Sequence, residues 1–272
     1  MTITFRARLV LVCLVAAGCF LGSPDARAAR KKTGIPRFDA AVEGGYAFLV
    51  ENADSVSNKR GFYVLAAYAL FKCDKTANKQ IIDRAVEMCL ESVKTGQFVP
   101  ELPYDHIYEC GLYTMFLADI DDGGRFRPQL QIMADYVQQT QKPDGSWTDP
   151  SSKDGDVSMC QYAMLALWAC QRVQCKVNPE TIDRSVAWFM RSGNADGGWG
   201  YRPGTTQGHG GGASTRNMTV AANSALGISR FLLHGPPNAP KEEVEEKDRA
   251  GGLLKRDTPE EEWKPTEGVF QG

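Results

Sequence analysis

Hydrophobic positions along the chain alternate between two kinds of helical segment. One kind is amphipathic, with apolar residues every three or four positions, and the other is apolar on nearly every side. The amphipathic segments are 40–51, 81–93, 127–140 and 181–191, and the apolar segments that follow them are 61–73, 107–120, 157–169 and 218–233. Such pairs, at about 45- to 55-residue spacing, predict an all-α array of four helical hairpins. The apolar helices must be buried, so they are expected to form an inner layer surrounded by amphipathic helices.

The third and fourth pairs are related in sequence. A shift of 52 residues places Asp144-Gly145-Ser146-Trp147 on Asp196-Gly197-Gly198-Trp199, and a shift of 59 places 159–167 on 218–226. The fourth pair therefore has the longer loop between its helices. The first two pairs lack the Trp motif and are interpreted as degenerate repeats.

Each residue type in the Trp loop has a physical role. Gly145 permits a turn that other residues resist, and Trp147 offers a large flat surface with one N–H donor. Gln141 can bond carbonyl groups at the end of the preceding helix, and Asp144 can accept backbone N–H groups. One possible use of the loop is an aromatic platform for a carbohydrate or cation.

The spacing of Gln141, Gly145 and Trp147 resembles the Q-x3-G-x-W repeat of the squalene–hopene cyclases. The run Asp196 to Tyr201, Asp-Gly-Gly-Trp-Gly-Tyr, is similar to the prenyltransferase/squalene oxidase repeat. The resemblance spans residues 38–234 and implies an α/α toroid, here partial or open because only four hairpins are visible. It also implies that the motif residues are structural clamps between repeats: Gln141, Asp144, Gly145, Trp147, Asp196, Gly197, Trp199 and Tyr201.

Two flanking segments differ from the repeat region, which is placed at 36–234. In residues 1–28, Arg6 and Arg8 precede an apolar run and an Ala26-Arg27-Ala28 site, which are the parts of a secretory signal peptide. The chain is thus expected to be exported after cleavage near Ala28, with no membrane span in the mature chain; a lipid anchor on Cys19 is the second option. The charged, Pro-containing residues 235–272 are expected to form a disordered tail.

Composition narrows the class of partner. Hydrophobic residues are 43% and charged residues 24% of the 272, typical of a soluble globular protein. The net charge of −2, without a basic stripe, excludes nucleic acid as the expected partner.

The cysteines outside the leader show no Cys-x-x-Cys spacing, which argues against a structural zinc site. Most lie in apolar helical stretches, so buried thiols are expected, with one disulfide bridge as the open alternative. They are Cys73, Cys89, Cys110, Cys160, Cys170 and Cys175.

Candidate chemistry is sparse. The Asp-rich D-x-D-D acid motif of the cyclases is missing, and Asp119, Asp121 and Asp122 are interpreted as a polar turn. The zinc set of protein prenyltransferases has an imperfect counterpart in Asp156, Cys160 and His209. Without a metal, Asp156 can serve as a helix N-cap and Cys160 as a core thiol. We therefore predict no cofactor, and a zinc ion is the alternative.

The inner-helix N-termini are expected to face one mouth of the toroid, where the helix dipole favours anions. Candidates to line this mouth are Asp105, His106, Tyr108, Asp156, Gln161, Arg216 and Asn217. The favoured hypothesis is a non-catalytic binding or scaffold module for a protein or an apolar small molecule, with self-association through an open repeat edge as a further option. The alternative is an enzyme acting on an isoprenoid or other apolar substrate.

Overall fold

The computed structural model describes residues 33–56, 59–203 and 212–235. Residues 1–235 and 236–272 form two separate units, and only the first is described below. The expected signal peptide, His209 and nearly all of the expected tail lie outside the described residues. Within the described ranges every regular element is helical, and none of these helices combines the length and hydropathy needed to cross a membrane.

The four predicted helical hairpins are confirmed. The first helices of the hairpins are α2 (Pro36–Asn52), α4 (Lys79–Glu91), α6 (Arg127–Gln139) and α8 (Pro179–Ser192). The second helices are α3 (Arg60–Cys73), α5 (His106–Ile120), α7 (Val157–Arg172) and α9 (Arg216–His234). Short 3-10 helices, η1 (Ala53–Val56) and η2 (Pro103–Asp105), precede α3 and α5.

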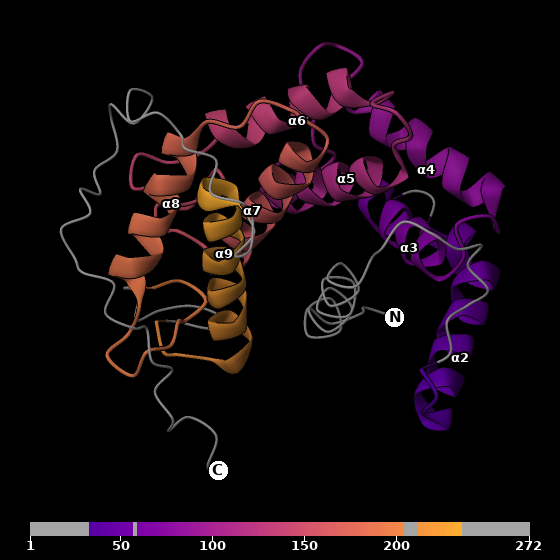
Figure 1. The fold of residues 1–272 in the computed structure, drawn as a ribbon, viewed down its shortest axis with the longest axis horizontal. Coiled ribbons are helices and arrows are strands. Elements are labelled where there is room, and N and C mark those ends of the chain that lie inside the picture. Colours follow the sequence, from indigo (N-terminus) through magenta and orange to yellow (C-terminus); the bar gives the residue numbers. More distant parts are fainter. Residues whose placement is uncertain (1–32, 57–58, 204–211, 236–272) are drawn as a thin grey trace. The chain divides into compact units, whose positions relative to one another are not determined.

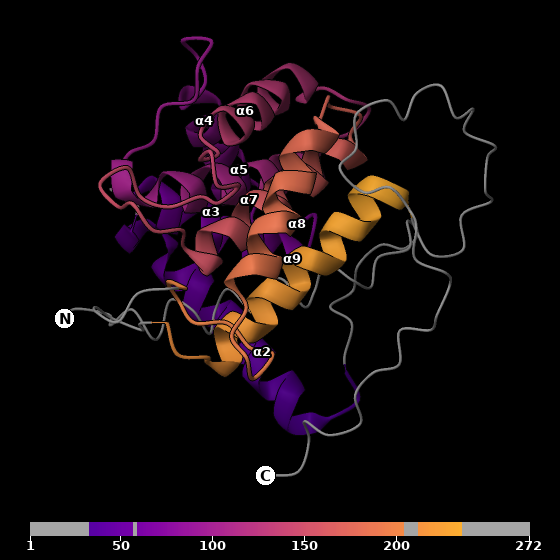
Figure 2. The same cartoon turned by 90° about the vertical axis from the view of Figure 1, so that its left-hand side faces the viewer.

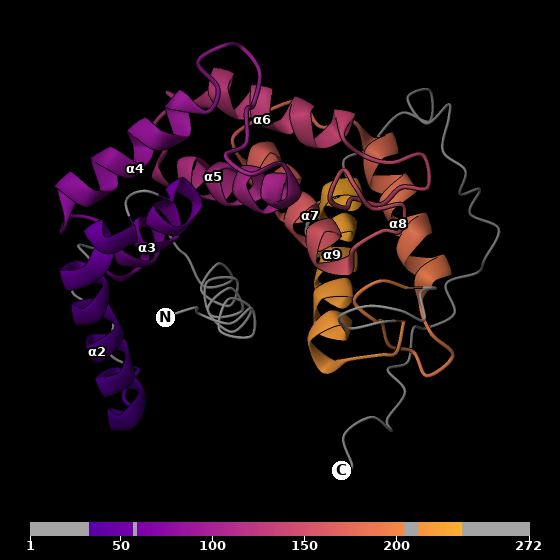
Figure 3. The same cartoon turned by 180° about the vertical axis from the view of Figure 1, so that it is seen from behind.

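The helices are arranged in the two predicted layers. Helix α5 packs against α3 and α7, and α7 packs against α9, so the apolar helices are neighbours of one another (Figures 1 and 2). Helix α4 packs on α3, α6 on α5 and α7, and α8 on α9 (Figure 3). Nearly all of α5 and α7 is buried, whereas α6 buries only a stripe of four residues. Helix α2 differs from the other outer helices because it buries none.

The Trp147 loop is bonded to both helices of its hairpin. The indole N–H donates to the carbonyl of Val137 on α6 at 2.8 Å. The backbone N–H of Trp147 donates to Cys160 Sγ on α7 at 3.2 Å, and its carbonyl accepts from the N–H of Asp156 at 2.9 Å. Since Trp147 is fully buried, each of these groups would be costly to leave unpaired.

The Trp199 loop repeats the same three bonds. Its indole donates to the carbonyl of Phe189 at 3.0 Å, its N–H donates to Thr219 Oγ1 at 3.1 Å, and its carbonyl accepts from Thr215 at 3.0 Å. Phe189 is the 52-residue equivalent of Val137, and Thr219 is the 59-residue equivalent of Cys160. The two loops therefore share their hydrogen bonds as well as their sequence pattern.

Gln141 connects the third hairpin to the fourth. Its amide donates to the carbonyl of Gly145 at 3.0 Å and to the carbonyl of Thr181 on α8 at 2.8 Å. Gly145 has a φ of 93°, and a Cβ there would lie 2.1 Å from the carbonyl oxygen of Arg184. Only glycine therefore lets this loop approach α8 so closely.

The second hairpin, interpreted as a degenerate repeat, retains a variant of the loop that lacks the tryptophan. Gly96 has a φ of 81°, and its N–H donates to the carbonyl of Val93, as that of Gly145 does to Lys142. Phe98 is buried two residues later and packs against the rings of Tyr113 and Tyr136. Phenylalanine thus takes the place of tryptophan and lacks the indole donor.

In the third and fourth hairpins, the Trp loop passes very close to the residue that precedes the N-cap of the inner helix. Only one of the two facing residues therefore has a Cβ. In the third hairpin Ser146 faces Gly155, where an added Cβ would lie 2.6 Å from the serine Cβ. In the fourth hairpin the two are exchanged: Gly198 faces Ser214, and an added Cβ would lie 2.7 Å from the serine Cβ. The serine hydroxyl bonds the loop aspartate in both cases, Asp144 in one and Asp196 in the other.

We expect Gly198→Ser to destabilise the protein by about 2 kcal/mol, because it overpacks this contact. Adding Ser214→Gly recreates the arrangement of the third hairpin and should recover roughly 1 kcal/mol or more. Urea denaturation of the two single variants and the double variant measures this coupling. Additive effects of the two substitutions would contradict the proposed exchange.

Candidate binding site on the inner helices

The N-terminal end of α7 is held by a buried aspartate. Asp156 is 1% exposed, and its Oδ1 accepts from the N–H groups of Ser158 at 2.9 Å and Met159 at 3.1 Å. This is the N-cap that the sequence allowed. Burial raises the pKa of Asp156, although the Ser158 hydroxyl and the Met159 N–H oppose the rise.

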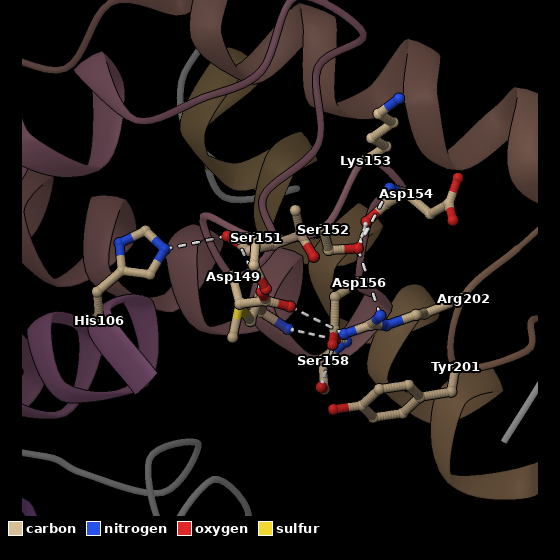
Figure 4. A network of polar contacts seen from close by, with 12 residues as sticks. His106, Asp149, Ser151, Ser152, Lys153, Asp154, Asp156, Ser158, Tyr201 and Arg202 are labelled. Atoms are coloured by element: carbon tan, nitrogen blue, oxygen red, sulfur yellow. Dashed lines mark hydrogen bonds and ion pairs between the residues drawn. The ribbon is translucent and has the colours of Figure 1, made fainter. Parts of the chain in front are cut away.

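A chain of hydroxyl groups leads from Asp156 to two other hairpins. Ser158 Oγ donates to Asp156 Oδ1 at 2.6 Å and lies 2.5 Å from the hydroxyl of Tyr108 on α5. The Tyr108 hydroxyl lies 3.3 Å from that of Tyr201, which follows the Trp199 loop. In Figure 4 the Tyr201 ring points toward Ser158 and Asp156. Burial raises the pKa of both tyrosines, so their hydroxyls stay protonated.

Beside this series of hydroxyl groups, Arg202 anchors the loop that follows Trp147. Its guanidinium pairs with Asp149 at 3.0 Å and donates to the Ser152 hydroxyl at 3.3 Å (Figure 4). Burial alone would raise the pKa of Asp149, but hydrogen bonds from Ser151 and the charge of Arg202 hold it below its usual range. The fourth hairpin thereby orders a loop of the third.

His106 is directed into the core rather than toward a ligand. Its Nε2 donates to the carbonyl of Thr148 at 3.0 Å, and its Nδ1 accepts from the hydroxyl of Tyr136 at 2.9 Å. This tautomer follows from the carbonyl acceptor. Burial lowers the pKa of His106, which favours the neutral ring.

The other predicted mouth residues occupy the first turns of inner helices. Asp105 directly precedes α5 and is half-buried, as is Gln161 on α7. Arg216 and Asn217 are exposed on the first turn of α9. Of the seven candidates, the structure connects Tyr108 with Asp156 through Ser158, and His106 is turned away from them.

The residues of the zinc alternative serve other contacts. Asp156 caps α7, and Cys160 Sγ bonds the backbone of Trp147. Burial raises the pKa of Cys160 well above its usual value, which disfavours the thiolate that binds metal. His209 lies outside the described residues, and among those described no cluster of three metal-binding side chains occurs.

A second feature is the line of side chains that α7 turns away from the outer layer. It contains Gln161, Leu165, Trp168 and Arg172, spaced one helical turn apart. Gln161 and Trp168 are half-buried and Arg172 is exposed on a helix that is otherwise mostly buried. The guanidinium of Arg172 lies 4.7 Å from the centre of the Trp168 ring.

Helix α5 carries a similar line of Tyr108, Leu112, Met115 and Asp119. Helices α5 and α7 contact each other near both ends of these lines. The rings of Tyr108 and Tyr162 are 5.0 Å apart, and Arg172 pairs with Asp119. Together, these lines form the inner face, with apolar residues in its centre and polar groups at its ends.

Asp119 organises the C-terminal ends of three inner helices. It accepts hydrogen bonds from Tyr68 at 2.5 Å and from Lys72, both on α3, and from Arg172 on α7. Burial alone would raise the pKa of Asp119, but the bonds from Lys72 and Tyr68 hold it below the usual value. The interpretation of Asp119 as part of a polar turn was wrong, because it belongs to the last turn of α5.

Glu109 is a buried carboxylate that the sequence pattern did not single out. It is the fourth residue of α5, as Cys160 is of α7 and Thr219 of α9. Its Oε2 accepts from the loop N–H of Glu101 at 2.7 Å, and its Oε1 lies 4.0 Å from Arg60. Burial raises the pKa of Glu109 despite the opposing Glu101 bond. The fourth residue of each of these three helices therefore accepts a loop N–H group.

These features define a two-layer array of α-hairpins in which repeated loops clamp the layers. The model of one known family, the prenyltransferase alpha-alpha toroid domain, matches residues 46–248. The chain belongs to this family, as the resemblance of its Trp loops predicted. No curated protein and no solved structure matches the chain.

We expect Asp119→Asn to lower the free energy of unfolding at pH 7 by about 2 kcal/mol, because Lys72 and Arg172 lose a shared buried partner. Because the pKa of Asp119 is depressed, the stability that this carboxylate contributes is lost as the pH falls through that pKa. The difference in unfolding free energy between the variant and wild type should therefore shrink toward pH 3. Urea denaturation at several pH values measures both effects. Asp122→Asn, on the exposed turn, is the matched control and should change little.

Glu109→Gln should behave in the opposite way. A raised pKa means that folding disfavours the charged form, so wild type loses stability as the pH rises through that pKa. The amide oxygen of Gln can still accept the Glu101 N–H group. We expect the variant to equal or exceed wild-type stability at pH 7.5 and to lose that advantage in acid. The control is Glu87→Gln on the exposed side of α4, and a variant less stable at every pH would disprove the assignment.

Proposed function

We propose that this chain is an exported binding module whose inner face takes up an apolar ligand, either a small molecule or an apolar segment of a protein. The observation that carries the proposal is the inner face itself. Its centre, formed by Leu112, Met115, Leu165 and Trp168, is apolar and aromatic, with Trp168 half-buried and the other three residues 6–7% exposed, and its ends bear Tyr108 and the Asp119 cluster. Such a surface suits a ligand with an apolar body and polar ends.

A role in binding rather than catalysis is supported by what the candidate acid–base residues do. Asp156, Cys160 and His106 each bond the backbone of a loop or helix start within the repeats. Export is supported by the basic, apolar and Ala-x-Ala parts of residues 1–28. Lipid attachment at Cys19 and self-association through a repeat edge stay predictions.

A second candidate is an enzyme that acts on an apolar substrate at the same face. The hydroxyl chain from Asp156 through Ser158 and Tyr108 to Tyr201 favours it, because burial raises the pKa of the acid and of both tyrosines. Turnover of an isoprenoid alcohol that is lost in Asp156→Asn, with binding retained, would establish this alternative.

Titration of the mature chain with a dansyl-labelled farnesol tests the binding proposal. We expect saturable fluorescence enhancement, and Trp168→Ala should weaken the affinity about tenfold, since burial of a large aromatic contributes on the order of 1.5–3 kcal/mol. Met190→Ala on α8, where Met190 is 69% exposed, is the matched control. Equal affinities of the two variants, or no saturation, would refute a ligand site on the inner face.

A further inference from the structure

The C-terminal end of α7 brings two cysteines together. The N–H of Cys175 donates to the carbonyl of Cys170 at 2.9 Å, and the N–H of Gln174 donates to that of Gln171 at 3.0 Å. Gln174 has a left-handed backbone with a φ of 63°. This pair of bonds is the Schellman cap, in which the side chains of the residues joined by the outer bond contact each other. In this chain both of those side chains are thiols.

The two thiols have different surroundings. Cys170 is fully buried, and its Sγ donates to the carbonyl of Leu130 on α6 at 3.4 Å. Cys175 is 7% exposed and lies between Gln174 and Lys176, which are both exposed. An incoming reagent therefore meets Cys175 first, and Cys170 lies behind it.

Electrostatics favour the same order of reaction. The neighbouring thiol lowers the pKa of Cys175 and raises that of Cys170, and the nearby charge of Arg127 lowers the pKa of Cys175 further. Since the thiolate is the nucleophile, Cys175 is the more reactive thiol of the pair. The Cys110 and Cys160 thiols, in contrast, are fully buried and their pKa values are raised.

We propose that Cys170 and Cys175 are a redox-active dithiol that closes to a disulfide by exchange with a small external disulfide such as oxidised glutathione. The Cys175 thiolate attacks one sulfur of glutathione disulfide and releases one glutathione thiolate. The Cys170 thiolate then attacks Cys175 Sγ of the mixed disulfide and releases the second. The two protons lost by the cysteines end on two glutathione thiols, and the protein is oxidised by two electrons as the glutathione disulfide is reduced.

Closure of this bond would fix the turn between α7 and α8. Arg127 on α6 already holds the turn, because its guanidinium donates to the Val173 carbonyl at 3.0 Å and to the Gln174 side chain at 3.1 Å. A disulfide adds a covalent constraint where the third hairpin passes into the fourth. The two cysteines lie at the opposite end of α7 from Asp156 and outside the inner face.

Peptide mapping tests the proposal on the full chain. The protein is incubated with excess oxidised glutathione, its remaining thiols are blocked with N-ethylmaleimide in denaturant, and it is digested with trypsin without reduction. Trypsin cleaves after Arg172 and Lys176, so fragments 154–172 and 173–176 stay joined only by the disulfide. We expect this linked pair, with Cys160 blocked, and a melting temperature a few degrees above that of the reduced protein.

Single variants separate the two steps. Cys170→Ser should trap Cys175 as a glutathione adduct, and Cys175→Ser should leave Cys170 unmodified, while the control Cys73→Ser should give the linked pair as wild type does. Wild-type mapping alone decides the proposal where a variant fails to fold. A wild-type chain with both cysteines blocked by N-ethylmaleimide, with a stable glutathione adduct, or with a different pairing would overturn it.

Discussion

The need to bond every polar group of the buried Trp loops governs this structure. Trp147 is fully buried, so its indole N–H, backbone N–H and carbonyl must each find a partner. They find one on α6, one on α7 and one at the residue that caps α7. Gln141 adds a bond to α8. One loop therefore sets the spacing of three helices. The Trp199 loop repeats the bonds to the two helices of its own hairpin.

This constraint explains the positions of Asp156, Cys160 and His106. Cys160 lies where the loop needs an acceptor, Asp156 lies where the first turn of α7 needs one, and His106 lies where the Thr148 carbonyl needs a donor. The side of each inner helix that faces away from the loops is not subject to the same demand. It carries the half-buried Trp168 and the exposed Arg172.

The hairpins could be predicted because hydrophobic periodicity distinguishes a buried helix from a half-buried one. The clamps could be predicted because the spacing of Gln141, Gly145 and Trp147 resembles the repeat of a known family. The loop of the second hairpin was missed because Phe98 replaces tryptophan, although Gly96 keeps its left-handed backbone. Asp119 was misassigned because its neighbours Asp121 and Asp122 suggest a turn, whereas its partners lie 47 to 53 residues away.

The fourth residue of the inner helices shows why a titratable side chain must be interpreted through its position. Glu109, Cys160 and Thr219 differ in acidity and reactivity, yet each accepts an N–H group from its loop. Burial raises the pKa of both Glu109 and Cys160, as it would for any acid placed there. A raised pKa at the fourth residue of an inner helix thus results from the buried place that the repeat gives to this residue. Cys175 differs because its pKa is lowered, and the cause is a second thiol that the helix cap holds against it.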